Sequence, residues 1–217
     1  MKLRFASLSL LAFCLTLATV PASAQDIYNN GPINGNTDAW TINFGFVVGD
    51  SFTVSTGTST ITGMSFGAWL YPGDTLTSAE VWISSGALGE GTTYFNQTVN
   101  FTASGCAMNQ YGFNVCTETG IFNGPTLNNG TYWVNLENAS TVAGDPVYWD
   151  ENSGVGCTSP GCPSQSLETG GSVPSESFTI LGTASSTTTG SVPEPGSLVL
   201  FASGFFGLTA LLRRKLF

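Results

Sequence analysis

The chain has 217 residues, enough for one folded domain with targeting segments, and a formal net charge of −9. Its five basic residues all lie within the first four and the last five positions, whereas the fourteen acidic residues lie between them and histidine is absent. The acidic body therefore cannot neutralise phosphates, form a Ser-His-Asp or Cys-His pair, or bind zinc through histidine, which excludes nucleic-acid binding and those classes of catalysis.

The N-terminus predicts a cleaved secretory signal peptide, residues 1–24. Two basic residues precede an apolar stretch at positions 5–20. Ala22 and Ala24 then supply small side chains at the two positions that signal peptidase reads, so we expect cleavage before Gln25. The alternative, a retained membrane helix, is disfavoured by Pro21 and by this cleavage site.

Residues 25–181 contain short runs in which apolar and polar residues alternate between Gly, Asn, Asp and Pro turns. This pattern predicts an all-β domain of roughly eight to ten strands, a jelly-roll-like antiparallel β-sandwich, with an immunoglobulin-like sandwich as the second choice. The residues expected to face the core are Phe52, Val54, Met64, Phe66, Ala68, Ala79, Val81, Ile83, Phe95, Val99, Phe101, Tyr132, Val134, Leu136, Phe178 and Ile180.

Four cysteines remain once the signal peptide is removed: Cys106, Cys116, Cys157 and Cys162. An even number in an exported domain predicts two disulfides. Of the three pairings, Cys106–Cys116 with Cys157–Cys162 is favoured because each pair closes a short loop. The alternative is a metal site made of four thiolates.

The C-terminal part is divided into a linker and a three-part tail. Residues 182–191 lack large apolar side chains and predict a flexible linker. In residues 192–217, a Pro-Glu-Pro motif precedes an apolar stretch at 197–212, a predicted transmembrane helix slightly shorter than the roughly 20 residues that span a bilayer comfortably. The basic end stays cytoplasmic by the positive-inside rule, so the acidic domain faces outward. The motif residues are Pro193, Glu194, Pro195, Arg213, Arg214 and Lys215.

This tail resembles the PEP-CTERM sorting signal of Gram-negative bacteria. The resemblance implies that exosortase removes the helix by cleavage near the Pro-Glu-Pro motif. It also implies a precursor held transiently in the inner membrane and a final place at the cell surface or in the extracellular matrix. Signal peptidase and exosortase are then the expected partners, and exopolysaccharide is a candidate partner. An ordinary single-pass anchor would explain the apolar stretch and the basic end, but not the Pro-Glu-Pro motif.

The upstream domain also resembles a domain often found before such tails. The segments DSFTV, GTYWVNLEN, VYWDENSG and SESFTILG carry this resemblance. It implies an architecture only, because no activity is assigned to that group.

Two tryptophans are candidates for stacking on sugar rings. Trp82 and Trp133 lie out of phase with the buried residues of their strands, which predicts that they lie on an outer face. The alternative is that loops cover both faces and that these side chains belong to the core. Core positions are expected for Trp40, Trp69 and Trp149.

Calcium is the candidate cofactor. Asp145, Asp150, Glu151 and Asn152 place hard oxygen ligands on or near a predicted loop, and calcium accepts six to eight such oxygens. Their spacing does not match an EF-hand, and the alternative interpretation is an ordinary turn.

Carboxylates are the only acid–base groups of the domain, so the simplest enzyme class that remains is a two-carboxylate glycosidase. A pair could come from Glu80, Glu137, Asp145, Asp150 and Glu151, although most of these read as solvated turn residues. We therefore expect no catalytic residues and a structural or interaction role at the cell surface or in the matrix. The alternative is a carbohydrate-binding module, which calcium could assist, and a glycosidase is the remote alternative.

Overall fold

The computed structural model describes residues 24–185. The predicted signal sequence up to residue 23, the end of the predicted linker and the whole sorting tail, with their predicted helices, lie outside the described residues. Within residues 24–185, no helix is both long and apolar enough to cross a membrane.

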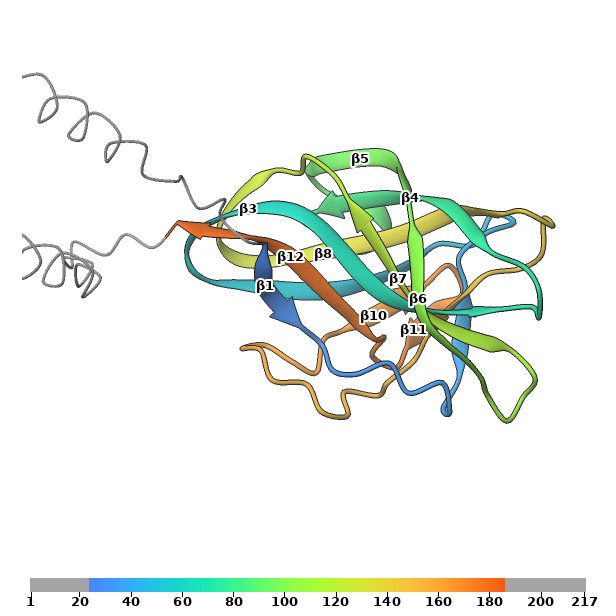
Figure 1. Cartoon of the computed structure of the whole chain (residues 1–217). Helices are drawn as coiled ribbons and strands as arrows, with labels where there is room; N and C mark the ends of the chain where they lie inside the picture. The colour runs from blue at the N-terminus through green and yellow to red at the C-terminus, as the bar shows by residue number, and fades with distance from the viewer. Residues whose placement is uncertain (1–23, 186–217) are drawn as a thin grey trace, which may run out of the picture. The chain divides into compact units, whose positions relative to one another are not determined.

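The described residues form antiparallel strands and one short 3-10 turn (Figure 1). The strands are β1 (Gln25–Asn29), β2 (Ala39–Thr41), β3 (Val48–Leu70), β4 (Leu76–Ser84), β5 (Thr93–Asn100), β6 (Thr102–Met108), β7 (Asn114–Ile121), β8 (Thr126–Thr141), β9 (Tyr148–Asp150), β10 (Ser166–Glu168), β11 (Gly171–Val173) and β12 (Phe178–Ser185). The 3-10 turn η1 (Ala87–Gly89) follows β4.

The long strand β3 organises the sheet. Its first part pairs with β8 and β10, and its second part pairs with β12, β7 and β9. Between Val54 and Thr58 the register with β8 shifts, and Gly57 there has a positive φ of 57°. The sheet curls on itself at this point, so that the half containing β4, β5 and β8 faces the half containing β1, β12, β7 and β6 (Figure 1).

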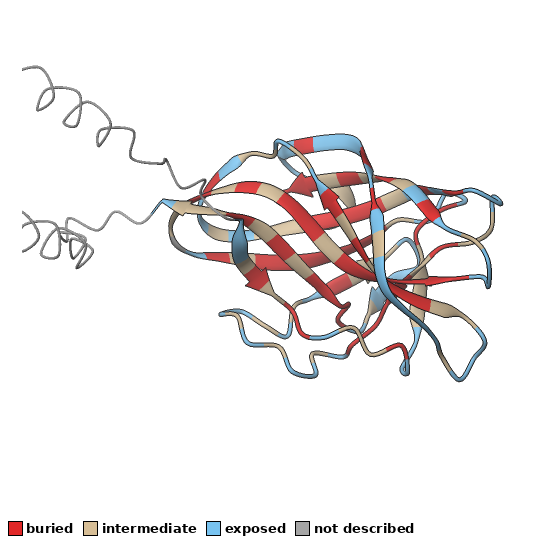
Figure 2. Cartoon of the chain, in the orientation of Figure 1, coloured by how far each residue is buried: buried red, intermediate tan, exposed pale blue. Residues whose placement is uncertain are grey.

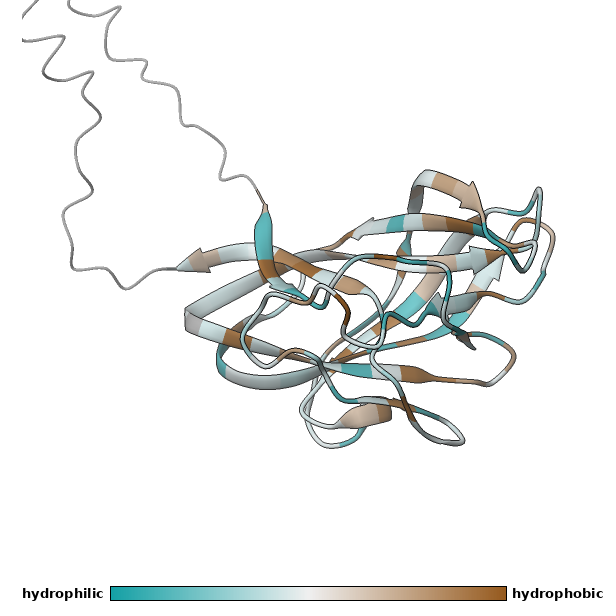
Figure 3. Ribbon diagram, turned by 90° about the horizontal axis from the view of Figure 1, so that it is seen from below, coloured by the Kyte–Doolittle hydropathy of each residue, from teal (hydrophilic) through white to brown (hydrophobic). Residues whose placement is uncertain are grey.

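The core lies between the two halves and follows the alternation of the strands. Buried and more exposed residues alternate along the strands in Figure 2, and hydrophobic and hydrophilic positions do so in Figure 3. Every residue expected to face the core is buried except Tyr132 and Trp40, which are half-buried. Burying this apolar surface is the main favourable term of folding, since the described domain contains no cation for an internal ion pair.

The all-β antiparallel class and the sandwich-like packing are confirmed. The structure has more strands than expected, because β2, β9, β10 and β11 are only three residues long and carry too little alternation to be recognised. The predicted boundary after residue 181 falls inside β12, which continues to Ser185. The jelly-roll order of the strands stays a prediction.

Both ends of the described domain lie where the sheet curls, because β1 and the end of β12 are neighbours there (Figure 1). From Thr58, which pairs with Ser185, β3 runs on to Leu70. A strand of this length extends roughly 40 Å. Leu70 pairs with Asn114, so the tip of the β6–β7 hairpin lies at the same end as Leu70. We call this the distal end.

Candidate functional site

The outer face of β4 and β8 brings together both tryptophans that the sequence singled out. Trp82 of β4 lies opposite Asn135 of β8, and Ser84 lies opposite Trp133. The two indoles are therefore diagonal cross-strand neighbours, whose backbones are about 7–8 Å apart in such a pair. Both side chains are half-buried. The three cross-strand pairs that we call the β4–β8 face are Ser84–Trp133, Trp82–Asn135 and Glu80–Glu137.

Two carboxylates stand opposite each other at one end of this face. Glu80 Oε1 accepts a hydrogen bond from Trp82 Nε1 at 2.6 Å, and its Oε2 accepts one from Asn138 Nδ2 at 2.9 Å. The bonds from Asn138 and Trp82 lower the pKa of Glu80, because they stabilise its charged form. Partial burial and the neighbouring Glu80 raise the pKa of Glu137. The Trp82 indole is thus held in place by a carboxylate that stays ionised.

The turn η1 covers the middle of the β4–β8 face. Leu88 N donates to Asn135 Oδ1 at 2.7 Å, and Asn135 Nδ2 donates to Ser84 Oγ at 2.9 Å, so the Asn135 amide is almost fully buried. Gly89 lies against the Trp82 ring with φ 79°, and a Cβ there would collide with the indole. One side of Trp82 is therefore packed and part of the ring stays exposed.

The four candidate calcium ligands are engaged in hydrogen bonds of the protein itself or lie apart. Asp150 is buried and accepts from Trp69 Nε1 at 2.7 Å, as well as from the backbone of Asn34 and Gly35. Burial nevertheless raises the pKa of Asp150, since these bonds offset only part of its desolvation. Asp150 thus anchors the loop after β1 and the end of β3.

The other three candidates serve different parts of the fold. Glu151 accepts from Ser153 Oγ at 2.6 Å and from Trp40 Nε1 at 3.4 Å. Asn152 is buried and donates to a backbone carbonyl. Asp145 lies in the loop before β9. Within residues 24–185, no group of three or more His, Cys, Asp and Glu side chains could jointly hold a metal ion. Calcium binding stays a prediction.

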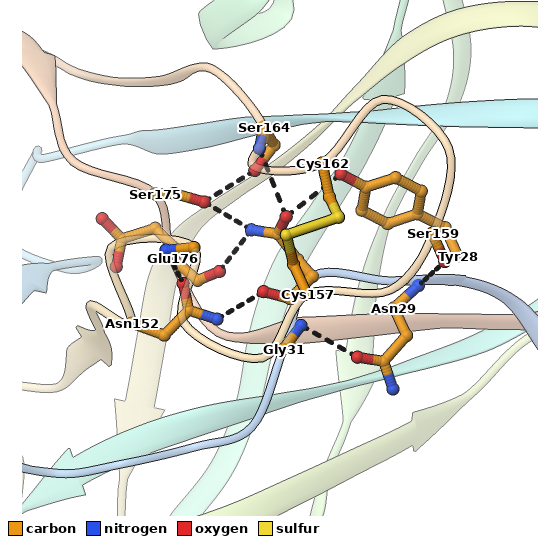
Figure 4. Close-up of a disulfide and its surroundings, with 12 residues drawn as sticks. Tyr28, Asn29, Gly31, Asn152, Cys157, Ser159, Cys162, Ser164, Ser175 and Glu176 are labelled. Carbon is orange, nitrogen blue, oxygen red and sulfur yellow. Dashed lines mark hydrogen bonds between the residues drawn. A yellow bond between two sulfur atoms is a disulfide. The ribbon is translucent and has the colours of Figure 1, made fainter.

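Both predicted disulfides are present. Cys106–Cys116 joins β6 to β7, and Cys157–Cys162 closes the loop that carries the TSPG turn. Figure 4 shows this second disulfide beside a network of polar groups, in which Asn29 N donates to Ser159 Oγ at 2.7 Å. The short loop is thereby fastened to the end of β1.

Sequence reasoning missed three carboxylic acids that are buried without a hydrogen-bond partner for at least one oxygen: Asp50, Glu118 and Glu176. Asp50 Oδ2 accepts from Glu176 N at 2.8 Å, which leaves Asp50 Oδ1 and both oxygens of Glu176 unpaired. The alternation of buried residues could have indicated two of them. Asp50 and Glu176 each lie two residues before a buried phenylalanine, which is the spacing of residues on one face of a strand.

Comparison with known families concerns the tail. A family model described as the PEP-CTERM protein-sorting motif matches residues 191–215. This match confirms the resemblance seen in the Pro-Glu-Pro motif, the apolar stretch and the basic end. It implies an exported precursor anchored in the membrane, with exosortase as its processing partner. No curated protein matches the chain.

Proposed function

We propose that this chain, a precursor with a PEP-CTERM sorting motif, matures into a non-enzymatic structural or interaction protein of the cell surface or extracellular matrix. We further propose that the β4–β8 face is where it contacts matrix polysaccharide. The observation that supports this best is the diagonal placement of the half-buried Trp82 and Trp133 on one face of β4 and β8, with the carboxyl groups of Glu80 and Glu137 beside them.

This combination suits sugar recognition for a physical reason. An indole offers a flat apolar surface to the C–H face of a sugar ring, and adjacent polar groups can bond to its hydroxyls. Glu80 fixes the Trp82 ring in advance, so little conformational freedom is lost when a ligand binds.

The charge of the domain selects among polysaccharides. Of the fourteen acidic residues only Glu194 lies outside residues 24–185, so the described domain contains thirteen acidic residues and no basic one. A polyanion would be repelled, whereas a neutral chain would not. The proposed ligand is therefore a neutral polysaccharide.

Co-sedimentation with insoluble neutral glucan and mannan tests the proposal, with anionic polygalacturonate for comparison. We expect binding to the neutral polymers only, and a several-fold loss of affinity in Trp82→Ala and in Trp133→Ala. Trp40→Ala is the matched control, because Trp40 is also half-buried but lies on β2. Equal loss in the control, or no loss in either variant of the face, would contradict the proposed site.

The same assay decides whether calcium assists. Binding is measured in EDTA and in excess calcium, with the wild-type chain and with Glu151→Gln. If binding persists unchanged in EDTA, polysaccharide binding does not need calcium, and the four candidate calcium ligands have a role in the fold alone. Binding that needs calcium and is weakened by Glu151→Gln would support the calcium-assisted alternative.

A glycosidase is the second candidate, and the Glu80–Glu137 pair favours it. Directly opposite carboxyls whose pKa values move in opposite directions are what an acid and a nucleophile require. The non-enzymatic proposal expects no release of reducing ends from any bound polysaccharide. Release that is abolished by Glu137→Gln, with binding retained, would replace it with the enzymatic one.

A further inference from the structure

A second group of aromatic side chains lies at the distal end, in the half of the sheet that does not carry the β4–β8 face. These residues come from the end of β3 and the position after it, from the tip of the β6–β7 hairpin and from β9. We call them the distal aromatic cluster: Trp69, Tyr71, Tyr111, Phe113 and Tyr148.

The rings of the cluster form one connected set. Tyr111 stacks on Trp69 with centroids 5.6 Å apart and an interplanar angle of 21°. Phe113 contacts Trp69, Tyr71 and Tyr148, with centroid separations of 5.8, 5.1 and 5.6 Å. Trp69 is only 5% exposed, whereas Tyr111 is 54% exposed. Tyr111 thus rests on a buried indole and presents a large part of its own ring to solvent.

The exposed ring is held by several hydrogen bonds. Trp69 Nε1 donates to the buried Asp150, and Tyr111 OH donates to the carbonyl of Asn36 at 3.2 Å. Asn109 closes the hairpin tip, since its Oδ1 accepts from the backbone of Tyr111 and Phe113, both at 3.0 Å. The Cys106–Cys116 disulfide clips the stem below. Such a surface is ordered before any ligand arrives.

Polar groups surround the rings, and the charged ones are acidic. Burial, and after it a hydrogen bond with the neighbouring Tyr71, raises the pKa of Tyr148, so this phenol stays a hydrogen-bonding O–H group. Asp74 N donates to the carbonyl of Tyr71, so a carboxylate-bearing turn directly follows. The surface therefore offers flat apolar area and hydroxyls, but no site for an anion.

We propose that the distal aromatic cluster is a second binding site for neutral polysaccharide, so that one domain can bridge two polysaccharide chains. It extends the proposed function to a second surface and depends on it only for the class of ligand. A second copy of the chain is a less suitable occupant, because each copy carries a net negative charge and no cation in the described domain, so the two copies repel each other. Two sites on separate surfaces also predict cross-linking, which one site cannot produce.

Bridging is measured with two colours of beads, both coated with the neutral glucan or mannan that the domain binds. The wild-type domain is expected to form mixed-colour clusters. The Tyr71→Ala/Tyr111→Ala double variant should still bind beads but should cluster them at least several-fold less, because one of its two sites is weakened. Phe46→Ala is the matched control, since Phe46 is an exposed aromatic residue outside the cluster.

The outcomes separate this inference from the proposed function. Clustering by the double tyrosine variant at the wild-type level would overturn the inference and leave the β4–β8 proposal standing. Binding that survives Trp82→Ala/Trp133→Ala but is lost in the double tyrosine variant would make the distal aromatic cluster the single binding site. It would contradict the β4–β8 site and overturn bridging. Light scattering without polysaccharide tests whether the wild-type domain forms dimers. Dimers that disappear in the double tyrosine variant would show that a second copy occupies the cluster, and would overturn the inference. A wild-type domain that binds no neutral polysaccharide would defeat both.

Discussion

Three buried carboxylic acids must do without a cation, because the described domain contains no lysine, arginine or histidine. Burial raises the pKa of Asp50 to about 8 and that of Glu118 to about 7, and it raises the pKa of Glu176 well above its ordinary value. Asp50 also accepts hydrogen bonds, including one from Glu176 N, which partly counter the effect of its burial. The raised pKa values favour the protonated, neutral form of these buried acids, whereas in most proteins a buried carboxylate is paired with a cation.

Glu118 allows the cost of such a group to be measured. Both of its oxygens are unpartnered and it faces the core, so its ionisation above neutral pH leaves a buried charge. We expect Glu118→Gln to raise the free energy of unfolding at pH 8 by up to about 3 kcal/mol and to change it little at pH 4. Urea denaturation at both pH values checks this, with exposed Glu90→Gln as control. An equal effect at both pH values would contradict the assignment.

Asp150 tests the opposite case, a buried carboxylate whose oxygens are well bonded. Asp150→Ala would leave the Trp69 indole N–H and the backbone N–H groups of Asn34 and Gly35 without their acceptor. We expect a loss of about 3 kcal/mol or more in the free energy of unfolding, and a smaller loss in Asp150→Asn, which keeps one acceptor oxygen. Chemical denaturation followed by tryptophan fluorescence measures both. A milder effect of alanine than of asparagine would refute the anchoring role.

At the scale of elements, alternation predicted which face of each strand is buried but not what else shares that face. Glu118 lies on the same face of β7 as buried Cys116, although a charged residue type is normally expected at the surface. The same alternation predicted an outer face for Trp82 and Trp133, and both are half-buried, with η1 packed against Trp82. Their diagonal pairing depends on the register between β4 and β8, which a single sequence does not contain.

The curl of β3 and the cover provided by η1 were also beyond sequence reasoning. Both depend on contacts between segments far apart in the chain, such as Leu88 with Asn135. The short strands β2 and β9 exist because β9 finds an edge of β3 to pair with. Local propensity over three residues is too weak to indicate such pairing.

The packing of η1 on Trp82 can be tested by a pair of glycine substitutions. Gly89 and Gly73 both have positive φ, 79° and 88°, but a Cβ meets the Trp82 ring at Gly89 and nothing within 4 Å at Gly73. Both alanine variants should suffer the backbone cost of about 1 kcal/mol. Gly89→Ala should lose at least about 1 kcal/mol more in the free energy of unfolding. Equal losses in urea titrations would show that η1 does not press on Trp82.

The two disulfides should differ in their contribution to the free energy of unfolding. Cys106–Cys116 closes a loop with a sequence separation of 10, against 5 for Cys157–Cys162. Chain entropy assigns about 3 kcal/mol to the longer loop and about 2 kcal/mol to the shorter one. Thermal unfolding of the two double-serine variants is expected to show the larger drop for Cys106→Ser/Cys116→Ser. The reverse order would mean that native contacts, rather than loop closure, dominate.

For the whole molecule, the raised pKa values make stability depend on pH in an unusual direction. Asp50 and Glu118 have higher pKa values in the folded state than in an unfolded chain, so the folded state binds more protons between about pH 4 and pH 8. Their contribution is complete below pH 4 and is lost as the pH rises. The free energy of unfolding should fall by up to about 1.4 kcal/mol per pH unit for each group. Denaturation series from pH 4 to 8 measure the slope, and a flat or rising profile would contradict it.

The acidic body also fits the export route that the tail implies. A domain stabilised by apolar burial and two disulfides needs no internal ion pairs, and its uniform charge keeps copies apart. Oxidation outside the cytoplasm supplies the cross-links, and removal of the tail would leave the domain free to meet extracellular polymers.

Intact mass spectrometry of the protein recovered from outside the cells tests the central claim, export with processing at both ends. We expect a chain that begins at Gln25 and ends near the Pro193–Pro195 motif. Its four cysteines should resist alkylation until a reductant is added. A full-length chain with freely alkylated thiols, found only inside the cells, would contradict export with processing at both ends.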